Sequence, residues 1–462
     1  MRTGALFLGV LLMASCPTAR SEEGLQPYPA NPFYWSYRGE PILLIGGSDE
    51  DNLFNDPELF RANLRVYEEI GANYFRCTLS WRDPNNVPPY LPDERGRYDL
   101  NRFHPEFWER LETFLQETAR RDIFVQIELW ATFDYYREHW EKNPFNPKNN
   151  LNYTAEESGL PESWSGHPAQ GAQPFFRTVP EAEHNRVVLP YQEAFARRVL
   201  EIALQYPNVL FCIDNETMAP EAWAVYWAEF IHRAAESLGR RAMVTEMWDP
   251  WDLRHEVQQR TLRHPDLFTY VEVSQNNWQE GEVHYNRLLW MRKQIQQIGP
   301  RPMNNVKVYA RLSGGRPNDP MVGWDRWWQN LFAGCAATRF HRPPSGSGAD
   351  ELAQTAIRSA RAFFAVFPPF DAEPRPELLA DREENEAYVL AKEDAFGLYF
   401  FRGGEVRLQV GPAERATVRW FNGTTGAFRE PEEVPVEDEF VRLSSPDRSK
   451  TWLALVEVQR KG

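Results

Sequence analysis

Short apolar runs alternate with longer amphipathic segments between about residues 41 and 376. Runs of this length are typical of buried strands, and apolar positions spaced by three and four residues indicate helices. The predicted strands cover 41–49, 73–81, 123–133, 209–217, 242–249, 268–277, 306–312 and 335–341. The predicted helices include 58–71, 102–122, 191–206, 221–239 and 284–299. Eight such units favour a parallel (β/α)₈ TIM barrel over a doubly wound sheet, which would carry a glycine-rich first turn.

The pattern changes after the proline-rich segment 367–374. Short, partly alternating runs follow without helices between them, at 388–391, 397–402, 406–410, 416–421, 440–443 and 451–458. Repeated strands separated by turn residues predict a small antiparallel β-sandwich. We therefore expect an α/β chain with a barrel over 22–376 and a sandwich over 377–462.

Residues 1–21 resemble a secretory signal peptide, with Arg2 followed by an apolar segment too short to span a bilayer. Cleavage before Glu22 or Glu23 would release a secreted or periplasmic protein. Cys16 follows Leu-Met-Ala-Ser, which resembles a lipoprotein signal, so a lipid anchor at Cys16 on the cell envelope is the alternative. No later segment has the pattern of a transmembrane helix.

Cysteine and histidine usage predicts no cofactor and no metal site. Cys77, Cys212 and Cys335 lie inside apolar runs at wide spacings, so buried free thiols are expected and not a disulfide framework. The nine His residues are scattered.

Charge and aromatic content narrow the class of partner. The net charge of −15 argues against nucleic acid, whose phosphates need a basic face. The 17 Trp, 18 Tyr and 29 Phe residues exceed what a core alone suggests. Aromatic faces also form the flat walls against which sugar rings stack, so a carbohydrate is the expected partner.

The strand 209–217 ends in Asn215 and Glu216. A carboxyl group at the C-terminal end of a barrel strand is typical of a catalytic residue. An Asn-Glu pair at a strand end is also how many retaining glycosidases present their general acid/base. We expect Glu216 to be catalytic.

Alternation along the strands predicts a charged barrel interior. Its polar set comprises Arg76, Glu128, Glu246, Glu272, Asn276, Lys307, Tyr309 and Arg311. A glycosidase needs a second carboxyl group, for which Glu246 is the first candidate and Glu272 the second. Buried ion pairs that fix the barrel register are the structural alternative for each of these residues.

Further residues are expected to contact a sugar at the mouth. Asp49 and Asp51 follow the first strand, and aromatic residues end several others. The predicted substrate-binding set is Asp49, Asp51, Arg76, Trp81, Glu128, Trp130, Asn215, Trp248, Asn276 and Arg311. The long polar segment 140–190 follows the third strand and should roof this mouth.

Two motifs resemble a known group of proteins. Asn31-Pro-Phe-Tyr-Trp with Gly39-Glu-Pro-Ile-Leu-Leu-Ile-Gly-Gly47 is similar to the opening of bacterial barrels related to glycoside hydrolase family 140. Trp420-Phe-Asn-Gly-Thr-Thr-Gly426 resembles that group's C-terminal collagen-binding-like sandwich. The resemblance implies a secreted glycoside hydrolase that cleaves O-glycosidic bonds of a poly- or oligosaccharide with carboxylate acid/base catalysis.

The seventh strand departs from that pattern. The wider clan carries a nucleophilic Glu at its end, whereas residues 305–313 contain no carboxylate and place Arg311 near the expected position. A second hypothesis is therefore a non-catalytic carbohydrate-binding protein on a degenerate barrel, where a cation could anchor an anionic sugar.

Overall fold

The computed structural model describes residues 24–171, 173–311 and 316–460. The segment expected to be a signal peptide, with Cys16, lies outside these residues. Among the residues described, no helix has the length and apolar character needed to cross a bilayer.

Eight parallel strands form the centre of the larger region, in two four-stranded sheets. One sheet has the order β10-β9-β8-β5, and the other β11-β12-β13-β4. The strands are β4 (Leu44–Gly47), β5 (Tyr74–Thr78), β8 (Phe124–Trp130), β9 (Val209–Asp214), β10 (Val244–Thr245), β11 (Val271–Glu272), β12 (Met303–Val308) and β13 (Ala337–Phe340). Pairing of β13 with β4 brings the last strand beside the first.

Hydrogen bonds bridge the two seams between these sheets, among them one backbone bond at each. Asn73 N–H donates to the Ile45 carbonyl at 2.9 Å, just before β5. Thr269 N–H donates to the Val244 carbonyl at 2.9 Å, just before β11. The eight strands thus follow one another around a (β/α)₈ barrel, as the sequence predicts.

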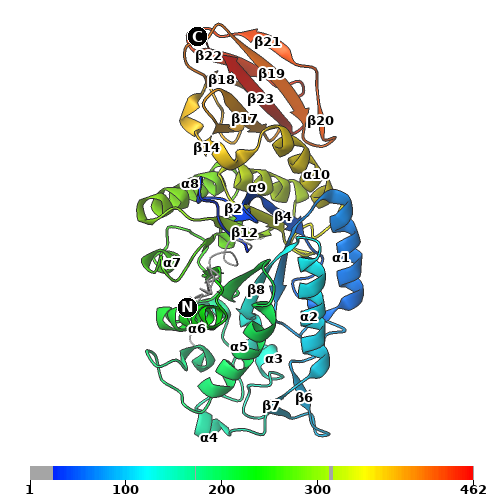
Figure 1. Ribbon diagram of the computed structural model, residues 1–462, viewed down its shortest axis with the longest axis vertical. Coiled ribbons are helices and arrows are strands. Elements are labelled where there is room, and N and C mark those ends of the chain that lie inside the picture. The colour runs from blue at the N-terminus through cyan, green and yellow to red at the C-terminus, as the bar shows by residue number, and fades with distance from the viewer. Residues whose placement is uncertain (1–23, 172, 312–315, 461–462) are drawn as a thin grey trace, which may run out of the picture.

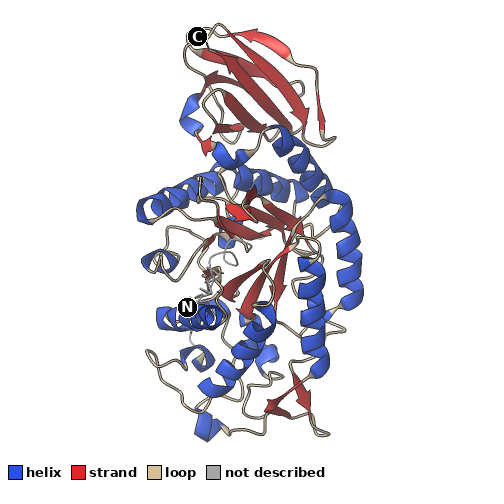
Figure 2. Ribbon diagram, in the orientation of Figure 1, coloured by secondary structure: helices blue, strands red, loops and turns tan. Residues whose placement is uncertain are grey.

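One helix follows each strand and covers the outside of the barrel (Figures 1 and 2). They are α1 (Pro57–Ile70), α2 (Pro105–Ala119), α5 (Leu189–Ala203), α6 (Glu221–Ser237), α7 (Arg260–Arg263), α8 (Gly281–Ile298), α9 (Pro320–Phe332) and α10 (Glu351–Val366). Short helices α3 (Arg137–Trp140) and α4 (Ala155–Ser158) lie in the long segment between β8 and α5.

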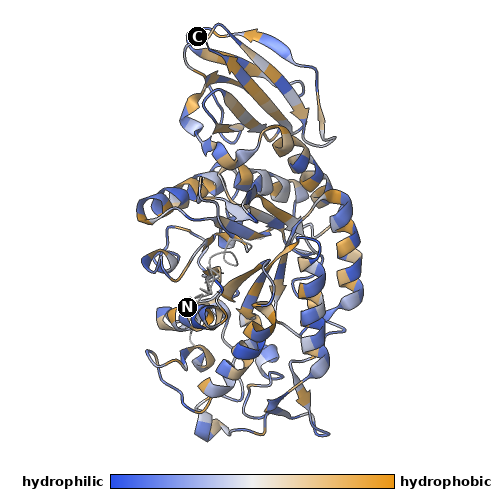
Figure 3. Ribbon diagram, viewed as in Figure 1, coloured by the Kyte–Doolittle hydropathy of each residue, from blue (hydrophilic) through white to orange (hydrophobic). Residues whose placement is uncertain are grey.

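Helix α1 shows how the sequence determines these elements. Asp56 caps its N-terminus by accepting hydrogen bonds from Glu58 N–H and Leu59 N–H, and Gly71 ends it at φ 72°. Its buried positions include Phe60, Leu64 and Tyr67, which share one face, and hydrophobic and hydrophilic residues accordingly alternate along α1 in Figure 3.

The three N-terminal strands lie against the end of the barrel where its parallel strands begin. They are β1 (Gln26–Pro27), β2 (Trp35–Tyr37) and β3 (Glu40–Ile42). Trp35 is fully buried and donates to Asn304 Oδ1 on β12 at 3.0 Å. A separate hairpin of β6 (Tyr90–Pro92) and β7 (Tyr98–Phe103) precedes α2.

The C-terminal region is antiparallel, as predicted. One sheet contains β14 (Glu373–Pro374), β16 (Ala387–Ala391), β17 (Ala395–Phe400), β23 (Trp452–Gln459), β19 (Arg415–Asn422), β20 (Ala427–Phe428) and β21 (Glu432–Pro435). The other contains β15 (Leu379–Ala380), β18 (Glu405–Gln409) and β22 (Phe440–Ser444). Buried residues of both sheets, among them Phe400, Val406, Trp420 and Leu443, form one core.

This region packs on α9 and α10 of the barrel (Figure 1). Trp328 stacks on Tyr399 with ring centres 5.7 Å apart, and Tyr399 donates to Asp325 Oδ1 at 2.9 Å. Phe363 of α10 contacts Phe421 at 5.6 Å. This contact involves the outer helices α9 and α10, and it does not involve the ends of the barrel strands.

Candidate active site

Glu216 lies directly after β9 in a backbone conformation that L-residues rarely adopt. Its φ is +56°, in the left-handed region where a non-glycine residue costs about 1–2 kcal/mol. Such strain persists only where surrounding contacts hold it, and it concentrates at functional sites. Its carboxyl group is mostly buried, with 15 % of the side chain exposed.

One side chain from β12 and one from the residue directly after that strand bind this carboxylate. Lys307 Nζ forms an ion pair with Glu216 Oε1 and also donates to Asn215 Oδ1. Tyr309 Oη donates to the same Glu216 oxygen at 3.2 Å. Burial raises the pKa of Glu216, but the charge and hydrogen bond of Lys307, with smaller contributions from Arg76 and Gln275, together lower that pKa to about 2. Glu216 is therefore an ionised carboxylate, and not the protonated acid that the sequence suggests.

Asp249 is the second carboxyl group at the mouth. Thr217 N–H donates to the Met247 carbonyl at 2.9 Å, and Asp249 N–H donates to the Thr217 carbonyl at 2.9 Å. This parallel bridge places Asp249, after β10, beside Glu216, after β9. Burial raises the pKa of Asp249 to about 6, and the Glu216 charge adds to the shift. The two neighbouring carboxyl groups thus hold opposite protonation states at mildly acidic pH.

Arg76 organises a layer of charges below the mouth. It binds both oxygens of Glu128, at 2.6 and 2.7 Å, and donates to Asn215 Oδ1 at 2.8 Å. Its third nitrogen lies 2.7 Å from Asp51 Oδ2. Because all these groups are buried, each charge depends on its partners.

Asp51 is surrounded by cations. Arg339 and Arg342 lie 3.2 Å from its two oxygens, and Arg76 approaches at 2.7 Å. Burial raises the pKa of Asp51, but Arg76 and its other basic neighbours together hold the pKa well below its usual range. The neighbouring His341 is driven toward its neutral form, because burial lowers its pKa. Asp51 and Glu128 therefore support the residues of the mouth from below.

Glu246 and Glu272, expected as partners of Glu216, are buried away from it. Glu246 Oε1 accepts from Asp214 N–H at 2.9 Å and from Met247 N–H at 2.8 Å. Glu272 binds the side chains of Gln126, at 3.1 Å, and Ser274. Burial raises the pKa of Glu272 to about 7, and the group belongs to a polar network in the barrel interior.

Strand β11 ends earlier than the sequence pattern predicts. The strand stops at Glu272, and residues Ser274–Trp278 form the 3₁₀ helix η6. Side chains therefore cease to alternate, and Asn276 turns to His284, whose carbonyl accepts from it at 2.9 Å. Asn276 does not reach the mouth.

Arg311 lies beyond the end of its strand and outside the barrel interior. Strand β12 ends at Val308, so alternation does not extend to residue 311. Its exposed guanidinium lies 5.5 Å from the centre of the Trp278 ring. Lys307, four residues earlier, is the cation of the seventh strand that meets Glu216.

The remaining predicted binding residues divide between core and mouth. Trp130 is buried against Trp227, with ring centres 5.0 Å apart, and Trp248 donates to Thr261 at 2.8 Å, so both are core residues. Asp49 binds Asn63 at 3.0 Å and the backbone of Ala349 at 3.1 Å. Trp81 is half-buried after β5, and Asn215 adjoins Glu216.

The long segment after β8 comes close to Glu216 at His167. Phe133 and His167 contact each other with ring centres 5.7 Å apart. Burial lowers the pKa of His167, and the Glu216 charge acts against that shift, which places this His near the carboxylate.

Sequence reasoning passed over Asp249, Tyr309 and Lys307 as site residues. The rule that selected Glu216, a polar side chain at a strand's C-terminal end, applies equally to Asp249 in Trp248-Asp249. The contacts of these residues with Glu216 form across the barrel, so no short sequence pattern predicts them. The described residues contain no cluster of three His, Cys, Asp or Glu side chains suited to a metal ion.

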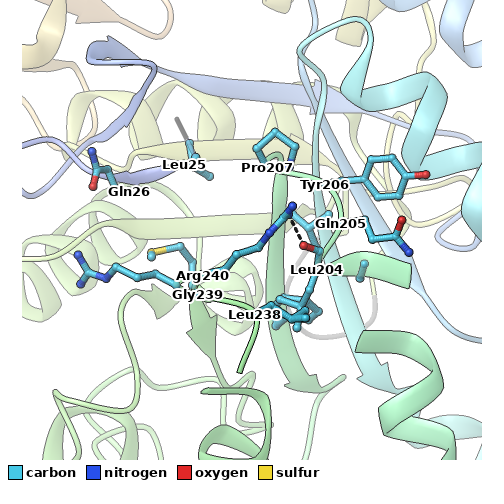
Figure 4. A pocket seen from close by; sticks show the side chains of 15 residues that line it. Leu25, Gln26, Leu204, Gln205, Tyr206, Pro207, Leu238, Gly239 and Arg240 are labelled. Carbon is cyan, nitrogen blue, oxygen red and sulfur yellow. Dashed lines mark hydrogen bonds between the residues drawn. The ribbon is translucent and has the colours of Figure 1, made fainter. Parts of the chain in front are cut away.

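A hollow near the N-terminal ends of the barrel strands has a different lining from the mouth. Its volume is about 380 Å³, and it is lined by segments 24–26, 203–207 and 238–241, by Val209 and Phe211 of β9, and by Met243 (Figure 4). Arg240 donates there to the Leu204 carbonyl. The N-terminal face of a barrel usually serves stability, and this hollow contains no carboxyl group.

A buried carboxyl pair below Glu216 gives a prediction about stability. Burial raises the pKa of Asp214 and of Glu246, and the Asp214 charge adds to the shift at Glu246. The folded protein then binds more protons than the unfolded chain, so the free energy of unfolding should fall as pH rises above about 4. Urea unfolding of Glu246→Gln should show a smaller loss between pH 5 and 8 than the wild type. An identical slope in both proteins would contradict this prediction.

Solved structures that share this architecture include glycoside hydrolases. One, titled "Glycoside hydrolase", has a TM-score of 0.63 at 9 % identity and covers 96 % of this chain and 98 % of its own. A glycoside hydrolase family 5 structure from Bacteroides vulgatus has a TM-score of 0.62 at 12 % identity, with 94 % of each chain covered. No protein-family model and no curated protein matches the sequence. At these identities the likeness establishes the fold.

Proposed function

We propose that the chain is a glycoside hydrolase whose active site is formed by Glu216 and Asp249. The observation that carries this proposal is their opposite protonation. Neighbouring carboxyl groups whose environments separate their pKa values are the usual acid and base of such enzymes. The related fold of known glycoside hydrolases and the aromatic residues around the mouth support it, as does the sequence resemblance to proteins related to family 140.

Each group has a defined role in this proposal. Asp249, with a pKa of about 6, donates its proton to the oxygen of the leaving sugar. Glu216 remains negative and stabilises the positive charge that develops on the sugar ring as the C–O bond to the leaving sugar breaks. A water molecule then adds to the anomeric carbon, and one of its protons passes to the Asp249 carboxylate, which restores the acid. Lys307 keeps Glu216 ionised, and Tyr309 orients it.

The proposal predicts a particular pH profile. Because Asp249 must be protonated to act, kcat/KM should fall as pH rises above about 6. Asp249→Asn should lower kcat/KM by about 10²–10⁴-fold on a substrate with a poor leaving group and should remove the alkaline limb. The kcat/KM of this variant on a dinitrophenyl glycoside, whose leaving group needs no protonation, should fall much less. The exposed Asp266 provides the control variant Asp266→Asn.

The experiment begins with a panel of soluble polysaccharides assayed for new reducing ends. Cleavage that survives Asp249→Asn with an unchanged pH profile would rule out its role as the acid. A second function, non-catalytic carbohydrate binding, is favoured by one observation: the seventh barrel strand, β12, carries Lys307 and no carboxylate. Binding of a polysaccharide without any cleavage would select that function.

A further inference from the structure

Trp251 is an exposed aromatic side chain beside the candidate active site. Of its side chain 55 % is accessible, whereas most Trp residues of the described chain are buried. It follows Asp249 by two residues in the segment after β10. A single exposed apolar residue is normal, whereas contiguous apolar surface often marks a binding site, so the neighbours of Trp251 decide what it does.

The surrounding segment holds this ring in place. Asp252 forms ion pairs with Arg254 at 2.8 Å and with Arg287 at 3.2 Å. Gln258 donates to the carbonyls of Trp248 at 3.1 Å and Pro250 at 2.6 Å. The backbone on both sides of Trp251 is therefore fixed, so a ligand would find the ring already placed.

A row of aromatic rings connects Trp251 with Glu216. Trp251 stacks on Trp278, with ring centres 5.1 Å apart and planes inclined by 24°. Trp278 meets Tyr309 edge-to-face at 6.1 Å, and the Tyr309 hydroxyl donates to Glu216 at 3.2 Å. Rings from three consecutive barrel units thus lead from the reactive carboxylate to the rim.

We propose that the Trp251–Trp278 pair is a sugar-binding subsite outside the reaction centre, which holds a pyranose unit of a polysaccharide chain. The inference rests on the proposed function, because the row of rings leads to the reaction centre only if Glu216 belongs to the active site. The substrate class is then a polymer or long oligosaccharide, and not a single terminal sugar on a small aglycone. The apolar C–H face of a pyranose ring matches the flat face of an indole.

The experiment measures binding separately from cleavage. Full-length wild type, Trp251→Ala, Trp251→Phe and Leu238→Ala are run through native gels containing hydroxyethyl cellulose, xylan, galactomannan or polygalacturonate. Leu238 is equally exposed, at 55 %, and lines the hollow near the opposite end of the strands, so its variant controls for loss of an exposed apolar side chain. Thermal unfolding checks that each variant folds.

We expect at least one polymer to retard the wild type, Trp251→Ala to raise its Kd by about 3- to 10-fold, and Trp251→Phe to restore most of the affinity. Equal mobility of wild type and Trp251→Ala in every polymer, including no retardation of either, overturns the subsite. Retardation dependent on Trp251 without cleavage would keep the subsite and reject hydrolysis. Cleavage of a polymer with kcat/KM independent of Trp251 would keep hydrolysis and reject the subsite.

Discussion

Glu216→Gln is expected to lower kcat by about 10³-fold, because the neutral amide cannot stabilise the cationic transition state. The substitution keeps the shape of the side chain, so affinity for the polysaccharide should remain. Rates with a substrate that the wild type cleaves, together with gel retardation, would measure the two effects. Full turnover in Glu216→Gln would exclude this carboxylate from the reaction.

The same variant should also lose stability. Lys307 is only 2 % exposed, and the substitution leaves its buried ammonium group with neutral acceptors, Asn215 and the new amide oxygen, and without the Glu216 charge. Breaking a buried ion pair from one side costs about 3–5 kcal/mol. The double variant Glu216→Gln/Lys307→Met should recover most of that free energy of unfolding and remain inactive. This pair of variants separates loss of chemistry from loss of folding.

The structure confirms the part of the fold that depends on local patterns. Strands predicted at 209–217 and 451–458 match β9 and β23, and the helix predicted at 58–71 matches α1. Strand ends were harder to predict, because Val308 and Glu272 carry no signal that the strand stops there. Two candidate residues, Arg311 and Asn276, were placed by extending alternation past those ends.

The pairing of charges could not be read from the sequence at all. Lys307 and Glu216 are 91 residues apart, and Arg76 and Asn215 are 139 apart. Only the closed order of strands brings them together. Which carboxylate ends beside which cation then decides its protonation, and the position of Glu216 at a strand end does not reveal it.

Arg76→Met is expected to lower the free energy of unfolding by about 3–5 kcal/mol. The substitution removes four contacts at once and leaves the fully buried Glu128 and the nearly buried Asp51 without their shared cation. Arg76→Lys should recover only part, because an ammonium group cannot bind both Glu128 oxygens in a fork. Urea unfolding of these variants measures the effect.

Arg121→Met is the matched control for Arg76→Met. Arg121 also binds two carboxylates, Glu68 at 2.8 Å and Glu117 at 2.7 Å, but lies on the surface. Exposed pairs contribute about 0–1 kcal/mol, so this variant should unfold almost like the wild type. The double variant Arg76→Met/Glu128→Gln should be more stable than Arg76→Met, since it removes one of the uncompensated charges. Equal stability of Arg76→Met and Arg121→Met would show that the charged layer does not support the mouth of the barrel.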